Sequence, residues 1–102
     1  ARAAEKDPSR EKLLMHGAEI NLQSINGYTA LLLAANRDHE RVVELLLRHG
    51  AEVDLQDSDG YTALMSAANN GHPAVLLRLL RARADMALRN ADGKTALQLA
   101  KE

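Results

Sequence analysis

Short apolar blocks alternate with polar, turn-forming stretches along the chain. One block covers residues 63–69 and follows Thr62, a residue type that favours the N-cap of a helix. Gly71 is the residue type usually found just past a helix end, and Pro73 is tolerated in a first helical turn. This pattern predicts one helix over 63–69 and a second from Pro73 to about Leu80.

The preceding segment predicts the same second helix over residues 40–48, where five of the nine residues are Val or Leu. Between the helical pairs, residues 51–60 are polar and end in Asp59-Gly60, a strong turn signal. Isolated helices of about nine residues do not hold in water. We therefore expect stability to come from the stacking of neighbouring units.

The pattern repeats every 33 residues. Gly27-Tyr28-Thr29-Ala30-Leu31 recurs at 60–64 as the same five residues and at 93–97 as Gly-Lys-Thr-Ala-Leu. Residues 24–56 and 57–89 are identical at 15 of 33 aligned positions. In the same register residues 13–19 align with 46–52, so the chain begins in the middle of a unit.

These residues resemble the ankyrin repeat. The resemblance rests on Gly60-Tyr61-Thr62-Ala63-Leu64, on Gly71-His72 between the helices, and on Leu46-Leu47-Arg48-His49-Gly50-Ala51 at the exit. It implies an all-α repeat solenoid of helix-turn-helix units joined by β-hairpin-like loops. We expect a single domain over 1–102: a half repeat at 1–23, repeats at 24–56 and 57–89, and a half repeat at 90–102. Such stacks usually bind other proteins on a concave surface of hairpin tips and first helices.

Some positions depart from the family pattern. Ala30, Ala63 and Ala96 stand where Pro is common, which leaves the fold unaffected because Ala is the better helix former. Arg83 replaces the Gly of the other units at a position that ordinarily takes a left-handed backbone, and this costs about 1 kcal/mol. Arg78 replaces the apolar Leu45, which we interpret as the edge of the stack. We expect Arg78, Arg81 and Arg83 to be solvated near a helix end, where the helix dipole favours cations. The alternative is that this group meets an acidic ligand.

The two ends leave alternatives open. Ser9, Arg10 and Lys12 replace apolar residues of the next unit, a polar outer face that suits a terminal repeat. Alternatively, both ends are boundaries within a longer array, in which case end-to-end self-association is expected.

Composition and charge narrow the function classes. With no cysteine, disulfide scaffolds, cysteine-ligated metal sites and thiol nucleophiles are excluded. Thirteen basic and fourteen acidic residues are too balanced for general attraction to nucleic acid. No apolar run reaches the roughly 18 residues of a membrane helix. We expect no membrane insertion and no cofactor.

The histidines and serines do not predict catalysis. His39 and His72 are one repeat apart, as are His16 and His49, and stacked units about 10 Å apart cannot share a metal ion. We expect His39 and His72 to hydrogen-bond the backbone of a neighbouring hairpin. No serine has a His–acid arrangement suggested by its spacing. The sequence therefore predicts neither an enzyme nor a metal site.

Residues that the repeat does not dictate are the candidates for partner contact. Those at the hairpin tips and at the ends of the first helices are Ile25, Asn26, Tyr28, Asn36, Arg37, Ser58, Asp59, Tyr61, Asn69, Asn70, Asp92 and Lys94. Tyr28 and Tyr61 stand out because tyrosine buries much area and keeps a polar end. The alternative is that each tyrosine packs across its hairpin onto the neighbouring unit.

Asn21 is a candidate modification site. Ankyrin stacks are substrates of an asparaginyl hydroxylase, and Leu13 with Glu19-Ile20-Asn21 fits its preference. The alternative is that Asn21 and the equivalent Asp54 stabilise a hairpin turn.

The sequence thus predicts a non-enzymatic module that binds a partner protein or peptide. The alternative is a structural ankyrin segment excised from a larger adaptor, channel or enzyme. The family's usual setting and the missing export signal predict an intracellular location, in the cytoplasm or nucleus.

Overall fold

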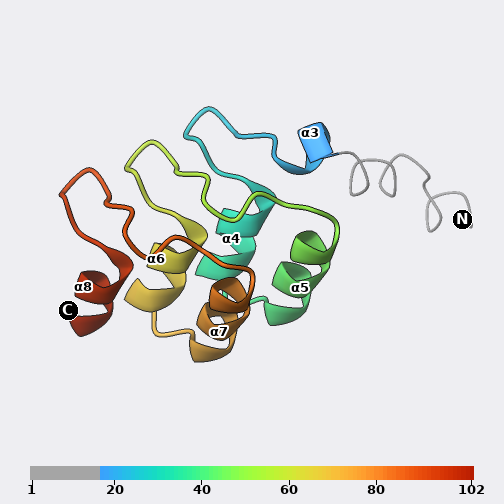
Figure 1. The fold of residues 1–102 in the computed structure, drawn as a ribbon. Helices are drawn as coiled ribbons and strands as arrows, with labels where there is room; N and C mark the ends of the chain where they lie inside the picture. Colours follow the sequence, from blue (N-terminus) through green and yellow to red (C-terminus); the bar gives the residue numbers. More distant parts are fainter. Residues whose placement is uncertain (1–16) are drawn as a thin grey trace, which may run out of the picture.

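The computed structural model describes residues 17–102, with side chains from Glu19 onward, and within that range it contains helices and no strands. The helices are α3 (Gly17–Ile20), α4 (Ala30–Asn36), α5 (Glu40–Arg48), α6 (Ala63–Asn69), α7 (Pro73–Arg81) and α8 (Ala96–Lys101). The first helices α4, α6 and α8 pack side by side in one layer, and the second helices α5 and α7 form another (Figure 1). This is the all-α repeat solenoid that the sequence predicted.

The first helices begin where the threonines predict. Thr29, Thr62 and Thr95 have extended backbones, and each hydroxyl accepts the N–H of the residue three positions later, at 3.1 to 3.3 Å. Each hydroxyl therefore satisfies one of the N–H groups that a helix start leaves unpaired. Thr29 and Thr62 are buried, so the caps lie inside the stack.

The helices end in left-handed residues. After the first helices, Asp38 has a φ of 59° and the equivalent Gly71 a φ of 69°. After the second helices, Gly50 has a φ of 88° and the equivalent Arg83 a φ of 65°. The left-handed backbone expected at Arg83 is confirmed. Asp38, which the sequence pattern did not indicate, also has a left-handed backbone.

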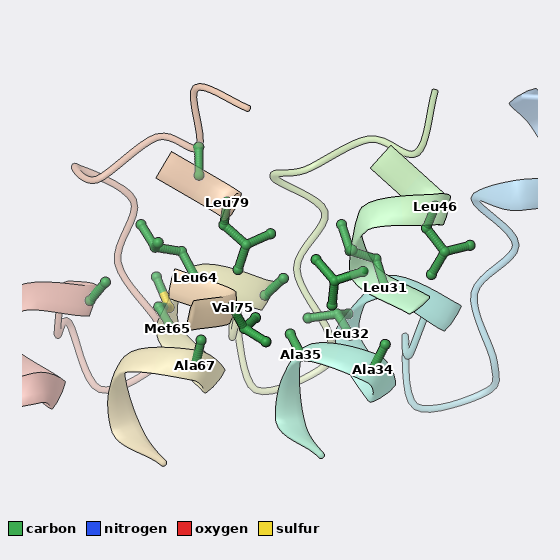
Figure 2. Packing of buried hydrophobic residues seen from close by; sticks show 14 of the residues in the cluster. Leu31, Leu32, Ala34, Ala35, Leu46, Leu64, Met65, Ala67, Val75 and Leu79 are labelled. Atoms are coloured by element: carbon green, nitrogen blue, oxygen red, sulfur yellow. The ribbon is translucent and has the colours of Figure 1, made fainter. Parts of the chain in front are cut away.

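The core lies between the two layers (Figure 2). Leu31 and Leu64 of the first helices are buried against Leu46 and Leu79 of the second helices. Ala35 and Ala67 are fully buried, and their small side chains allow neighbouring helices to approach closely. A core without Phe or Trp is thus filled by leucine and alanine.

The loops between units stack on one another. The N–H of Ser58 donates to the carbonyl of Asn26, and the N–H of Ala91 donates to that of Asp59, each at 2.9 Å. Gln56 Nε2 donates to the carbonyls of Gly60 in its own loop and Arg89 in the next unit, at 2.8 and 3.0 Å. The hairpins at 24–28 and 57–61 are therefore each hydrogen-bonded to the hairpin of the following unit.

The structure describes the amino-terminal half repeat only in part. In the 33-residue register Gly17 is equivalent to Gly50, which follows a helix, whereas the structure places Gly17 within helix α3. Ser9, Arg10 and Lys12, with His16, lie outside the described residues.

Within residues 17–102 no helix has the length and apolar character needed to cross a membrane.

Candidate protein-binding site

A groove of about 430 Å³ runs between repeats 24–56 and 57–89, on the side of the hairpins and first helices. Its lining residues are Tyr28, Leu32, Leu33, Asn36 and Arg37 from the first of these repeats, and Asp57, Asp59, Tyr61, Ser66, Asn69 and Asn70 from the second. We refer to this set of residues as the groove. Both repeats are needed to form it.

The groove brings together seven of the twelve predicted partner-binding residues: Tyr28, Asn36, Arg37, Asp59, Tyr61, Asn69 and Asn70. Ile25, Asn26 and Ser58 are exposed at the neighbouring hairpin tips, outside the lining. Asp92 and Lys94 belong to the next hairpin and are not part of the groove. Their role in binding stays a prediction.

Sequence reasoning missed part of the lining. Leu33 stands where the next repeat has Ser66, and this difference was the available signal that the position is not dictated by the repeat. Asp57, in the polar stretch 51–60, also lines the groove and was not among the predicted contact residues. Leu32 belongs to the core and contributes to the floor of the groove.

The apolar part of the groove comes from repeat 24–56. Tyr28 is 39% exposed and Leu33 is 40% exposed, although most other leucines of the first helices are buried. Tyr61 differs from Tyr28, because it is half-buried and packs against the hydrophobic core. The two repeat-equivalent tyrosines therefore differ in exposure: Tyr61 packs against the core, and Tyr28 is more exposed to solvent.

The polar floor is a hydrogen-bonded bridge between the repeats. Asn36 Oδ1 accepts hydrogen bonds from Ser66 Oγ at 3.0 Å and from Asn70 Nδ2 at 2.6 Å. The carbonyl oxygen of Asn36 lies 2.9 Å from His72 Nε2. Asn36 and Asn70 are thus engaged in holding neighbouring repeats together.

His72 corrects one expectation in detail. Its ring bonds the backbone of the preceding repeat, but at the end of a first helix and not in a hairpin. The reason is that His72 precedes α7 and faces the carboxyl end of α4, where carbonyl groups lack helical partners. Within residues 17–102 no group of three potential metal ligands is found.

Arg78 corrects another expectation. It does not lie solvated at an edge, because its Nε donates to Glu40 at 2.8 Å and its Nη1 lies 3.5 Å from Glu44. Both partners belong to α5 of the preceding repeat. The substitution of a leucine by arginine thus replaces apolar packing between second helices by an ion pair. The ion pair therefore links Arg78 to the preceding repeat.

The hairpin end of the groove is acidic. Asp57 Oδ1 accepts the N–H groups of Asp59 and Tyr61, each at 2.9 Å, and so shapes the turn. Asp59 is exposed, and among residues 17–102 no hydrogen bond or ion pair engages its carboxylate. At the opposite end, Arg37 follows the last residue of α4.

The lysine of the last hairpin has an acidic partner. Lys94 forms an ion pair with Glu102, and this hydrogen-bonded carboxylate raises the pKa of the lysine above its ordinary value. Asn90 Oδ1 accepts the N–H groups of Asp92 and Lys94, as Asp57 does one repeat earlier. The Asn90 amide nitrogen is buried without a partner in the described part of the chain. Lys94 is therefore not an isolated cation.

Asn21 joins neighbouring units. Its Oδ1 accepts the N–H of Glu52 at 2.8 Å, and Asp54 accepts the N–H of Asp85 at the same distance. These bonds span 31 residues, so the pair stabilises the stack and not only a local turn. Hydroxylation of Asn21 stays a prediction.

The fold and the groove define a class: helical repeat proteins in which each unit contributes a hairpin and two short helices. The family comparison is specific within that class. A model of ankyrin repeats, in three copies, matches residues 1–90, and the chain therefore belongs to the ankyrin-repeat family. No curated protein matches the chain at a significant level. Ankyrin repeats are generally protein-interaction modules and typically non-enzymatic.

Proposed function

We propose that this chain is a non-enzymatic recognition module that binds a protein or peptide in the groove. The observation that carries the proposal is the exposure of Tyr28 and Leu33, both from repeat 24–56, in a groove that the next repeat completes. Neither side chain needs that exposure to support the fold, because the equivalent Tyr61 is more buried and Ser66 replaces Leu33. The family's usual setting supports an intracellular partner, in the cytoplasm or nucleus.

Tyr28→Ala and Leu33→Ser test this function. We expect each to weaken partner binding at least about tenfold, because partner contact with a central aromatic or apolar anchor is lost. The immobilised protein would capture partners from cell lysate, and the affinity of purified partners would be measured by calorimetry. Leu33→Ser copies the residue of the next repeat, so the fold should tolerate it.

Leu77→Ser is the matched control, since Leu77 is 49% exposed on the second helix α7, outside the groove. It should leave capture unchanged. Partners that bind Tyr28→Ala and Leu33→Ser as tightly as the unaltered chain would contradict the proposal. Thermal unfolding of each variant separates lost binding from lost folding.

A second candidate is a structural segment that stacks on further ankyrin units. Leu97 is 55% exposed, whereas the equivalent Leu31 and Leu64 are 3% and 1% exposed. Ala100 is exposed as well, while Ala67 is fully buried. In the complete repeats a second helix covers this register, so another unit of the same fold suits this surface best.

Leu97→Lys tests the second candidate. If the surface stacks on another unit, the 102-residue chain should self-associate with rising concentration in sedimentation velocity, and Leu97→Lys should remain monomeric. Leu77→Lys adds the same charge to α7 and should self-associate as before. Equal behaviour of the two variants would argue against stacking through α8.

A further inference from the structure

The groove is chemically asymmetric along its length. Tyr28 and Leu33 provide exposed apolar surface, and Ile25, outside the lining, is 99% exposed on the hairpin that carries Tyr28. The hairpin of the next repeat places Asp57 and Asp59 against this surface. An occupant therefore meets an apolar wall from one repeat and carboxylates from the other.

The acidic end has no cation of its own. Asp57 Oδ1 accepts two backbone N–H groups, and these neutral donors do not cancel the negative charge of the carboxylate. No basic side chain in residues 17–102 pairs with Asp57 or Asp59, and Lys94 of the next hairpin is paired with Glu102. Asp92 adds a further carboxylate at the equivalent tip.

The only base among the lining residues lies at the other end. Arg37 follows α4, and the seven residues of that helix span about 10 Å. No ion pair joins Arg37 to Asp57 or Asp59 among residues 17–102. The groove thus combines carboxylates from one hairpin, the apolar surface of Tyr28 and Leu33, several amide side chains, and one base at the end of α4.

We infer that the occupant is a peptide segment of a partner protein in which an apolar side chain stands next to a lysine or arginine. This inference rests on the proposed function of the groove. The apolar side chain lies against Tyr28 and Leu33, and the cation lies beside Asp57 and Asp59. An acidic residue in the same place would meet two carboxylates, and this repulsion supplies the specificity.

Arg37 adds direction to the same recognition. A base placed at the helix end would face the guanidinium of Arg37, while a base at the hairpin end faces the aspartates. The peptide lies with its basic residue toward the hairpins.

Selection from a library of random displayed peptides tests this inference on the full chain. We expect enrichment of peptides with Lys or Arg next to a large apolar residue, with affinity that falls as salt is added. Asp59→Lys should weaken these peptides at least about tenfold and favour acidic ones on reselection. Asp92→Lys makes the same change one repeat later, outside the groove, and should retain the original preference.

The outcomes separate this inference from the function beneath it. Peptides that need Tyr28 and Leu33 but carry no basic preference, or that tolerate Asp59→Lys, would overturn the inference and leave the binding function standing. Enriched peptides that ignore Tyr28→Ala and Leu33→Ser, or no enrichment at all, would overturn the function and the inference together. Unaltered thermal unfolding of Asp59→Lys would show that its loss of binding is local, as expected for a side chain without partners among residues 17–102.

Discussion

Single residues in this protein adopt left-handed backbones at the helix ends. Four helix ends are followed by such residues: Asp38 and Gly71 after the first helices, and Gly50 and Arg83 after the second helices, all with φ between 59° and 88°. Glycine adopts this region without a Cβ clash, while other residues are strained there. Aspartate tolerates it better than arginine, because its short polar side chain can bond locally. Arg83 is therefore the most strained of the four.

Arg83→Gly should stabilise the protein by about 1 kcal/mol, because it removes a left-handed residue with a Cβ. For a domain of this size that corresponds to a rise in melting temperature of roughly 4–8 °C. Asp38→Gly should give a smaller rise. Thermal unfolding followed by circular dichroism measures both, and a lower melting temperature for Arg83→Gly would show that its arginine is not strained.

At the scale of helices, local signals set the helix bounds, and contacts between units set the side-chain partners. The local signals around α6 and the repeat of the same pattern predicted α5 and α6 with their observed bounds, and α7 to within one residue. Which helix partners Arg78 was not predictable, because Glu40 lies 38 residues away and is opposite only after two second helices have packed. The same holds for His72 and the end of α4, 36 residues apart.

At the scale of the whole molecule, hairpin stacking makes two glycines unequal. A Cβ on Gly60 would lie 2.8 Å from the backbone nitrogen of Ala91 and 2.9 Å from the Cα of Asn90. A Cβ on Gly93 would meet nothing within 4 Å among the described residues. The two φ values, 80° and 76°, are nearly equal. Any difference between their alanine variants therefore reports the contact between hairpins.

Gly60→Ala should destabilise the protein more than Gly93→Ala, by about 1–3 kcal/mol, because the added methyl group forces two backbones apart. Both variants carry the same left-handed strain, so subtracting one from the other removes it. Urea unfolding measures the difference in the free energy of unfolding. Equal losses would mean that neighbouring hairpins do not pack closely.

The sequence by itself determined the period, the helix bounds in the complete repeats, the capping residues and the strained position of Arg83. These depend on interactions within a few residues, which a 33-residue register displays directly. Tertiary structure alone decided that Tyr61 packs into the core while Tyr28 stays exposed, that Leu33 and Asp57 join the groove, and that Arg78 pairs with α5. Equivalent residues have the same local environment but different neighbours in the stack, and it is the neighbours that set burial, charge pairing and the shape of a binding surface.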